Sequence, residues 1–156
     1  MVSIKKCIDS TFVSNKSFFV EKFESELKKI IKSKYIIPFN SGTSALHLAL
    51  LGNEINNNHE VLLPSINFVA AANAVLYSNT TPHFIDVCKN NLTIDFDNLE
   101  KYLNKFKFKK KNLYNPKTKK FIKAIIVLHT FGYVADLTKA RKICKKFNLI
   151  LIEDAA

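Results

Sequence analysis

The stretch that decides the fold is "EVLLPSINFVAAANAVLYSNTTPHFIDV", from Glu60 to Val87. It opens with a short apolar run, predicted to be a strand, that ends at Pro64. Small and apolar residues at 67–79 then predict a closely packed helix, and a second strand is predicted to end at Asp86. Two short buried strands joined through a helix are typical of a mainly parallel sheet with helices on both faces.

The same alternation continues on both sides of this unit. Apolar periodicity predicts helices at 17–33, 95–103 and 136–147 and within the stretch 39–52 after its polar start, and short strands at 35–39, 121–129 and 149–154. We therefore expect an α/β fold, organised as a single domain over residues 1–156. The basic segment Lys105–Lys120 is the one expected insertion.

Composition limits the classes of protein that this chain can belong to. The 156 residues are 47% hydrophobic and 12% aromatic, which is typical of a globular domain with a real core. No apolar run approaches the roughly 18 residues of a membrane-spanning helix, and the first residues do not resemble a signal peptide. The three cysteines are scattered and lack metal-binding spacing. This pattern fits a reducing cytoplasm, so we expect a cytoplasmic protein without a metal or a membrane partner.

The net charge of +11 permits a nucleic-acid partner. Much of this charge lies in "KFKFKKKNLYNPKTKKFIK" (105–123) and "KARKICKK" (139–146), and the first stretch alternates lysine with phenylalanine. Such a pattern supplies charge for phosphates and rings for bases. A solvated loop and a solvated helix face explain the same residues, and we favour this second interpretation.

A polar "NSGTSAL" segment lies where a strand should lead into a helix. Gly42 would permit a tight turn, and Thr43 and Ser44 would place hydroxyl groups at the start of the helix. The free N–H groups and the dipole of that helix start favour an anion, such as a phosphate or a carboxylate. Plain helix capping explains the same residues.

Three more residues lie at predicted strand ends, where ligands bind in such sheets. Asp154 follows the apolar "LILIE" run, where a carboxylate needs a partner such as a cationic ring nitrogen. Phe68 precedes a helix and would lie flat on a ligand ring, although a core position explains it as well. His129 is either a site residue or a structural histidine.

These blocks, in this order, resemble the DegT/DnrJ/EryC1/StrS family of sugar aminotransferases, which use pyridoxal 5'-phosphate. The resemblance rests on "NSGTSALHLAL", the 60–87 stretch, "IKAIIVLHTFGYVADLTKARKI" and "LILIEDAA", and it runs from about residue 10 to residue 156. It implies the large domain of fold-type I enzymes and a homodimer. The "LLPS" and "NPKTKKFIKAIIVLHTFG" segments look most like the branch that aminates nucleotide-linked 4-keto-6-deoxy sugars for nonulosonic (legionaminic-type) acids, with glutamate as the usual amino donor.

The resemblance also implies a role for each matched residue. Gly42, Thr43 and Ser44 match the pattern that holds the cofactor phosphate. Phe68 matches the aromatic residue that stacks on the pyridine ring. Asp154 matches the aspartate that keeps the pyridine nitrogen protonated. His129 lies in a matched block without a definite role.

The chain departs from the family pattern in what it lacks. In the family, the lysine that binds the cofactor covalently lies some thirty residues beyond "EDAA", and no lysine here matches it. We therefore expect a single partial domain, truncated from the family's fold, that binds the cofactor weakly or not at all and is inactive alone. We also expect the final strand, residues 149–152, to be poorly covered by other elements and prone to association. The alternatives are a non-catalytic remnant that pairs with a full-length subunit and a basic nucleic-acid-binding module.

Overall fold

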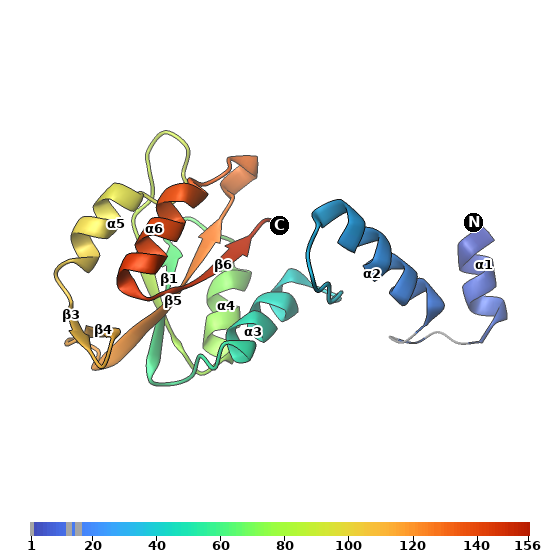
Figure 1. Cartoon of the computed structure of the whole chain (residues 1–156), viewed down its shortest axis with the longest axis horizontal. Coiled ribbons are helices and arrows are strands. Elements are labelled where there is room, and N and C mark those ends of the chain that lie inside the picture. The colour runs from blue at the N-terminus through green and yellow to red at the C-terminus, as the bar shows by residue number, and fades with distance from the viewer. Residues whose placement is uncertain (1, 12–13, 15–16) are drawn as a thin grey trace. The chain divides into compact units, whose positions relative to one another are not determined.

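The computed structural model describes residues 2–11, 14 and 17–156. The chain divides into two compact units, residues 1–40 and residues 41–156. The first unit contains helices α1 (Val2–Asp9) and α2 (Phe18–Ile31), and the second contains the sheet (Figure 1). The predicted helix at 17–33 is therefore present as α2.

The second unit alternates helices and strands as the sequence predicts. Its elements, in chain order, are α3 (Gly42–Gly52), β1 (His59–Pro64), α4 (Val69–Tyr77), β2 (Thr81–Ile85), α5 (Phe96–Leu103), β3 (Lys107–Lys109), β4 (Asn112–Asn115), β5 (Lys120–Leu128), the short 3-10 turn η1 (Thr130–Gly132), α6 (Leu137–Phe147) and β6 (Ile150–Asp154). Asp95 and Asp136 cap α5 and α6 by accepting hydrogen bonds from the backbone N–H groups of Asn98 and Lys139.

The sheet is mixed, with a parallel core. Strands β2, β1, β5 and β6 lie side by side in that order and are parallel. Strand β5 is long enough for two partners along one edge: β4 pairs with its first residues in the antiparallel sense, and β6 pairs with residues 124–128. The hairpin β3–β4 thus extends the sheet at its amino end, within the segment predicted as an insertion.

Helices cover both faces of the sheet. Alternate residues of β5 serve two separate cores, because successive side chains of a strand point to opposite faces. Ile125 and Val127 pack with α5 and α6, whereas Ala124 and Ile126 pack with α3 and α4. Figure 1 shows these helix pairs on opposite sides of the sheet. The structure therefore confirms the predicted α/β fold.

One prediction about apolar segments is wrong, and a second is wrong in part. The predicted strand at 35–39 is not a strand, and Tyr35 and Ile37 are 69% and 65% exposed. A strand needs a hydrogen-bonded neighbour, and no segment of residues 2–11, 14 and 17–156 pairs with it. The final strand is also better covered than expected. Leu149 and Ile152 are buried, one in each core, whereas Ile150 and Leu151 are half-buried. The outer backbone edge of β6 has no partner strand among the described residues.

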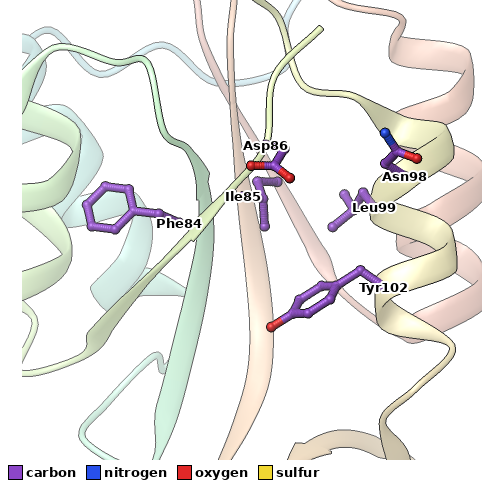
Figure 2. Close-up of a pocket in the computed structure, with 6 residues that line it drawn as sticks. All are labelled: Phe84, Ile85, Asp86, Asn98, Leu99 and Tyr102. Carbon is purple, nitrogen blue, oxygen red and sulfur yellow. The ribbon is translucent and has the colours of Figure 1, made fainter.

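A buried carboxylate connects the amino ends of the strands. Glu60 on β1 is only 1% exposed and accepts hydrogen bonds from the Asn115 side chain (3.1 and 3.2 Å). Its Oε2 lies 2.7 Å from Nδ1 of His83, and Nε2 of His83 lies 2.9 Å from the hydroxyl of Tyr102. Figure 2 shows Tyr102 reaching from α5 toward the sheet. The network therefore ties β1, β2, β4 and α5 together.

We expect this network to make stability depend on pH. Burial alone raises the pKa of a carboxyl, but hydrogen bonds from His83, Thr118 and Asn115 outweigh it and hold the pKa of Glu60 below its ordinary value. A lowered folded-state pKa stabilises the fold above the unfolded pKa of about 4.3, and this contribution is lost as the pH falls through the folded value. Glu60→Gln should therefore cost about 1.5–3 kcal/mol of unfolding free energy at neutral pH.

Urea unfolding at neutral pH and at about pH 3 measures this effect. The difference between Glu60→Gln and the parent chain should shrink in acid. Glu100→Gln is the matched control, because Glu100 forms an exposed ion pair with Lys146. That substitution should cost at most about 1 kcal/mol. Equal costs for the two variants would contradict the assigned role of Glu60.

Candidate functional site

The candidate site lies at the carboxyl edge of the parallel strands. β1 ends at Pro64, β5 at Leu128 and β6 at Asp154, and the parallel pairing puts these ends on one side of the sheet. The loops that follow these strands carry Phe68 and His129. In open α/β sheets this edge is where ligands bind.

The start of α3 combines capping with free donors. Ser41 is the N-cap, and its hydroxyl accepts a hydrogen bond from the Ser44 N–H (3.2 Å) and lies 3.0 Å from the Ser44 hydroxyl. Plain capping therefore explains part of the motif, and both the N–H and the hydroxyl of Ser44 are engaged by Ser41. Within the part of the chain that the structure describes, the half-buried Thr43 hydroxyl has no hydrogen-bond partner. Thr43 is thus the hydroxyl best able to bind an anion here.

Gly42 is not needed for a tight turn, contrary to the sequence interpretation. Its backbone does not adopt the left-handed conformation that favours glycine. A Cβ atom built at this position meets no other atom within 4 Å. The space beside the first turn of α3 is therefore open.

Phe68 is not a core residue. It occupies the N-cap position of α4, and its side chain is 76% exposed. Before it, the side-chain amide of Asn67 donates a hydrogen bond to the Pro64 carbonyl oxygen and shapes the turn that leaves β1. A large exposed ring on a fixed turn provides a flat apolar surface for a ligand.

Asp154 ends β6 next to the end of β5. The His129 N–H donates to the Asp154 carbonyl oxygen (3.1 Å), which continues the β5–β6 ladder. The Asp154 carboxylate accepts a hydrogen bond from the Ala156 N–H (3.2 Å). It forms no ion pair with any described residue of 2–11, 14 and 17–156. This half-buried carboxylate is therefore available to a cationic ligand group.

The His129 ring supports the loop after β5. Its Nδ1 accepts a hydrogen bond from the Ala135 N–H (3.1 Å), so Nε2 carries the ring proton in the neutral form. That Nε2 lies 3.9 Å from a Glu153 carboxylate oxygen, and Arg141 lies 4.0 Å from the other oxygen. Sequence analysis missed Glu153 and Arg141. The sequence did contain a signal for Glu153. Adjacent residues of a strand face opposite sides, so the Glu153–Asp154 pair places one carboxylate on each face of the sheet.

The structure thus brings some of the predicted site residues together. Asp154 and His129 are neighbours, and Phe68 follows β1, on the other side of β5. Two strand spacings separate β1 from β6, which is about 10 Å. A planar ligand with a cationic ring nitrogen suits an exposed aromatic ring and a free carboxylate, so the chemistry of these side chains fits pyridoxal phosphate. The loops after β1 and β5 (65–68 and 129–136) and residues 155–156 contain no lysine.

Comparisons with known proteins identify the family of this chain. The sequence model of the DegT/DnrJ/EryC1/StrS aminotransferase family matches residues 1–156. The chain belongs to this family. The chain is 33% identical to the GDP-perosamine synthase of Caulobacter vibrioides, over 98% of this chain and 37% of that protein.

Solved structures of similar proteins agree with this chain in fold. A DegT/DnrJ/EryC1/StrS aminotransferase from Brucella abortus superposes with a TM-score of 0.86 at 27% identity, over 99% of this chain and 39% of that one. NtdA from Bacillus subtilis, with bound cofactor PMP, superposes with a TM-score of 0.76 at 30% identity, over 90% of this chain and 29% of that one. This chain therefore spans less than two fifths of the length of these relatives.

Two absences apply to the described residues only. Across residues 2–11, 14 and 17–156, no helix is long and apolar enough to cross a membrane. The same residues contain no group of three or more histidine, cysteine, aspartate or glutamate side chains that could hold a metal ion.

Proposed function

We propose that residues 1–156 provide one part of the cofactor site of a pyridoxal-phosphate-dependent sugar aminotransferase. The observation that carries this proposal is the Asp154 carboxylate, which lies unpaired at the end of β6. A carboxylate in this position costs free energy unless it meets a cation, and a protonated pyridine nitrogen is such a cation.

Each residue has a distinct role in this proposal. When bound, pyridoxal phosphate supplies a ring that withdraws electrons from the substrate carbon. Asp154 holds a proton on the ring nitrogen, and Phe68 covers one face of the ring and excludes water from it. The Thr43 hydroxyl and the first N–H groups of α3 bind the phosphate. His129 positions the loop between β5 and α6, beside Asp154.

The rest of the active site comes from outside these 156 residues. The lysine that holds the cofactor covalently would belong to the remainder of the family fold, in the same chain or in a partner. As the family resemblance implies, the complete enzyme would be a homodimer that aminates a nucleotide-linked 4-keto-6-deoxy sugar, with glutamate as donor. The motifs of the nonulosonic acid branch support this class of substrate. The three free cysteines are compatible with work in the cytoplasm.

Replacing Thr43 tests the phosphate site. The tested protein is a chimera in which residues 1–156 replace the matching segment of the Caulobacter vibrioides GDP-perosamine synthase. Thr43→Val should weaken pyridoxal phosphate binding by about 1–2 kcal/mol, because one hydrogen bond to a charged group is lost. The fold should persist, since Ser41 still caps α3.

Equilibrium titration of the cofactor-free chimera measures this loss. Thr138→Val is the matched control, because Thr138 is an exposed threonine in the first turn of α6. It should leave the affinity unchanged. If Thr43→Val also left the affinity unchanged, the "NSGTSAL" motif would be a helix cap only.

Exposed apolar side chains and an unpaired strand edge favour a second function, which is pairing with another subunit. Ile30 and Ile37 are 75% and 65% exposed, and the outer edge of β6 has no partner among the described residues. Such surfaces promote association. We therefore expect the 156-residue chain to self-associate, and Ile30→Glu with Ile37→Glu to reduce that association.

Sedimentation velocity over a range of protein concentrations measures this association. The control adds the same charge at two exposed polar positions, Asn57→Glu and Asn90→Glu. A parent chain that stays monomeric at every concentration would contradict the pairing proposal.

A further inference from the structure

Ten lysines lie in a part of the chain that contains no acidic residue. Between Glu100 and Asp136 the sequence has no aspartate or glutamate. The lysines of this part are Lys101, Lys105, Lys107, Lys109, Lys110, Lys111, Lys117, Lys119, Lys120 and Lys123. So uneven a distribution creates a local positive field that is independent of the overall charge.

The fold gathers nearly all of these lysines at the amino end of the sheet. They lie on and beside the β3–β4 hairpin, in the turn between β4 and β5, and at the start of β5. We call this surface the basic face. Within residues 17–156, none of the ten forms an ion pair with a carboxylate. The basic face is separate from the candidate cofactor site, because β5 starts at Lys120 on the basic face and ends at Leu128 beside that site.

A hollow of about 310 Å³ opens in the basic face. It lies between the end of α5 and the turn between β4 and β5. Lys105 and Lys117 supply its charge, whereas Tyr102, Phe106 and Pro116 supply rings. A hollow that combines ammonium groups with aromatic and proline rings fits a planar group that carries a phosphate.

The wall of this hollow is preorganised. The Tyr102 hydroxyl is held by His83, which is held in turn by the buried Glu60. The Tyr102 and Phe106 rings meet edge to face, with centroids 5.1 Å apart. Tyr102 also lines a neighbouring pocket, which Figure 2 shows. That pocket is lined by the Asp86 carboxylate as well, which would repel an anion. The two hollows therefore differ in the charge that they accept.

We propose that the basic face binds single-stranded nucleic acid. Phosphates lie on Lys105, Lys107 and Lys117, and one base occupies the hollow against Phe106. The sequence alone favoured a solvated loop for this segment, and the preorganised hollow is the observation that changes the balance. A membrane surface is too flat to enter a concave site, and an acidic peptide lacks the regular alternation of charged phosphates and planar rings. A single strand supplies both phosphates and unstacked bases.

Fluorescence anisotropy of a labelled oligothymidylate with the 156-residue chain tests the charge contribution. The variant Lys105→Gln/Lys107→Gln/Lys117→Gln should reduce the slope of log K against log salt by about 2, because three phosphate contacts are lost from a single strand. The control, Lys5→Gln/Lys22→Gln/Lys28→Gln, removes the same charge from α1 and α2 and should keep the slope. Circular dichroism verifies that each variant is folded.

A second variant tests the ring. Phe106→Leu retains an apolar side chain but removes the stacking surface, so we expect about tenfold weaker binding of the oligonucleotide. The same variant should leave binding to polyglutamate, a charged polymer without rings, unchanged. Equal effects of the two lysine variants would overturn the proposal. So would an unchanged affinity of Phe106→Leu, or binding only to polyglutamate or to vesicles that contain phosphatidylserine.

Discussion

Residues 1–156 alone will not transfer an amino group to a nucleotide-linked keto sugar, whereas the chimera with the Caulobacter vibrioides GDP-perosamine synthase will. The reason is the position of the lysines. The loops after β1 and β5 contain none, and the two residues after β6 are alanines. The amine that would bond covalently to the cofactor, and then move protons as a base, is therefore missing from these loops.

Incubation with pyridoxal phosphate, glutamate and the keto sugar measures turnover directly. Borohydride trapping followed by peptide mapping then shows which lysines bind the cofactor. The 156-residue chain should show scattered labelling of exposed lysines, because it is very basic. Turnover by this chain together with stoichiometric labelling of one of its lysines would refute the account.

Asp154→Asn in the chimera should lower the rate of amino transfer by about tenfold to a hundredfold, or more. The amide cannot hold a proton on the ring nitrogen, and the loss of a charge-assisted hydrogen bond of ~1.5–3 kcal/mol corresponds to such a factor. Cofactor affinity should fall much less, because Thr43 and the start of α3 still bind the phosphate. The measurement is kcat at saturating cofactor.

The matched control for this variant is Asp97→Asn. Asp97 is an exposed carboxylate that pairs with Lys139 on the surface of α5 and α6. Removing its charge should leave kcat unchanged. An equal loss of kcat in both variants would mean that net charge, and not the position of Asp154, controls the rate.

Sequence patterns predicted the second unit well because its cores are local and regular. The apolar run of β5 is buried on both faces, and the aspartates that precede α5 and α6 cap them as the capping rule requires. Long-range pairing was less predictable. An extended, apolar segment at 35–39 has the composition of a strand, but a ladder needs a neighbour that composition does not reveal.

The surroundings of the site side chains were also hard to predict from the sequence, because they too depend on the fold. A core position was one of the two interpretations of Phe68, yet its place before α4 leaves the ring exposed. Sequence position predicted two free hydroxyl donors at the start of α3, but the Ser44 hydroxyl is engaged by the Ser41 hydroxyl. The connection from Glu60 through His83 to Tyr102 joins residues from three elements, so no local pattern could have predicted it.

The measurement that tests the central claim most directly is the protonation state of the cofactor ring. Nuclear magnetic resonance of the chimera, loaded with pyridoxal phosphate labelled with nitrogen-15, reports this state through the chemical shift of the ring nitrogen. We predict the shift of a protonated pyridinium with Asp154 in place and that of a neutral pyridine in Asp154→Asn. The same shift in both proteins would contradict the assignment of Asp154 and, with it, the cofactor site proposed for this chain.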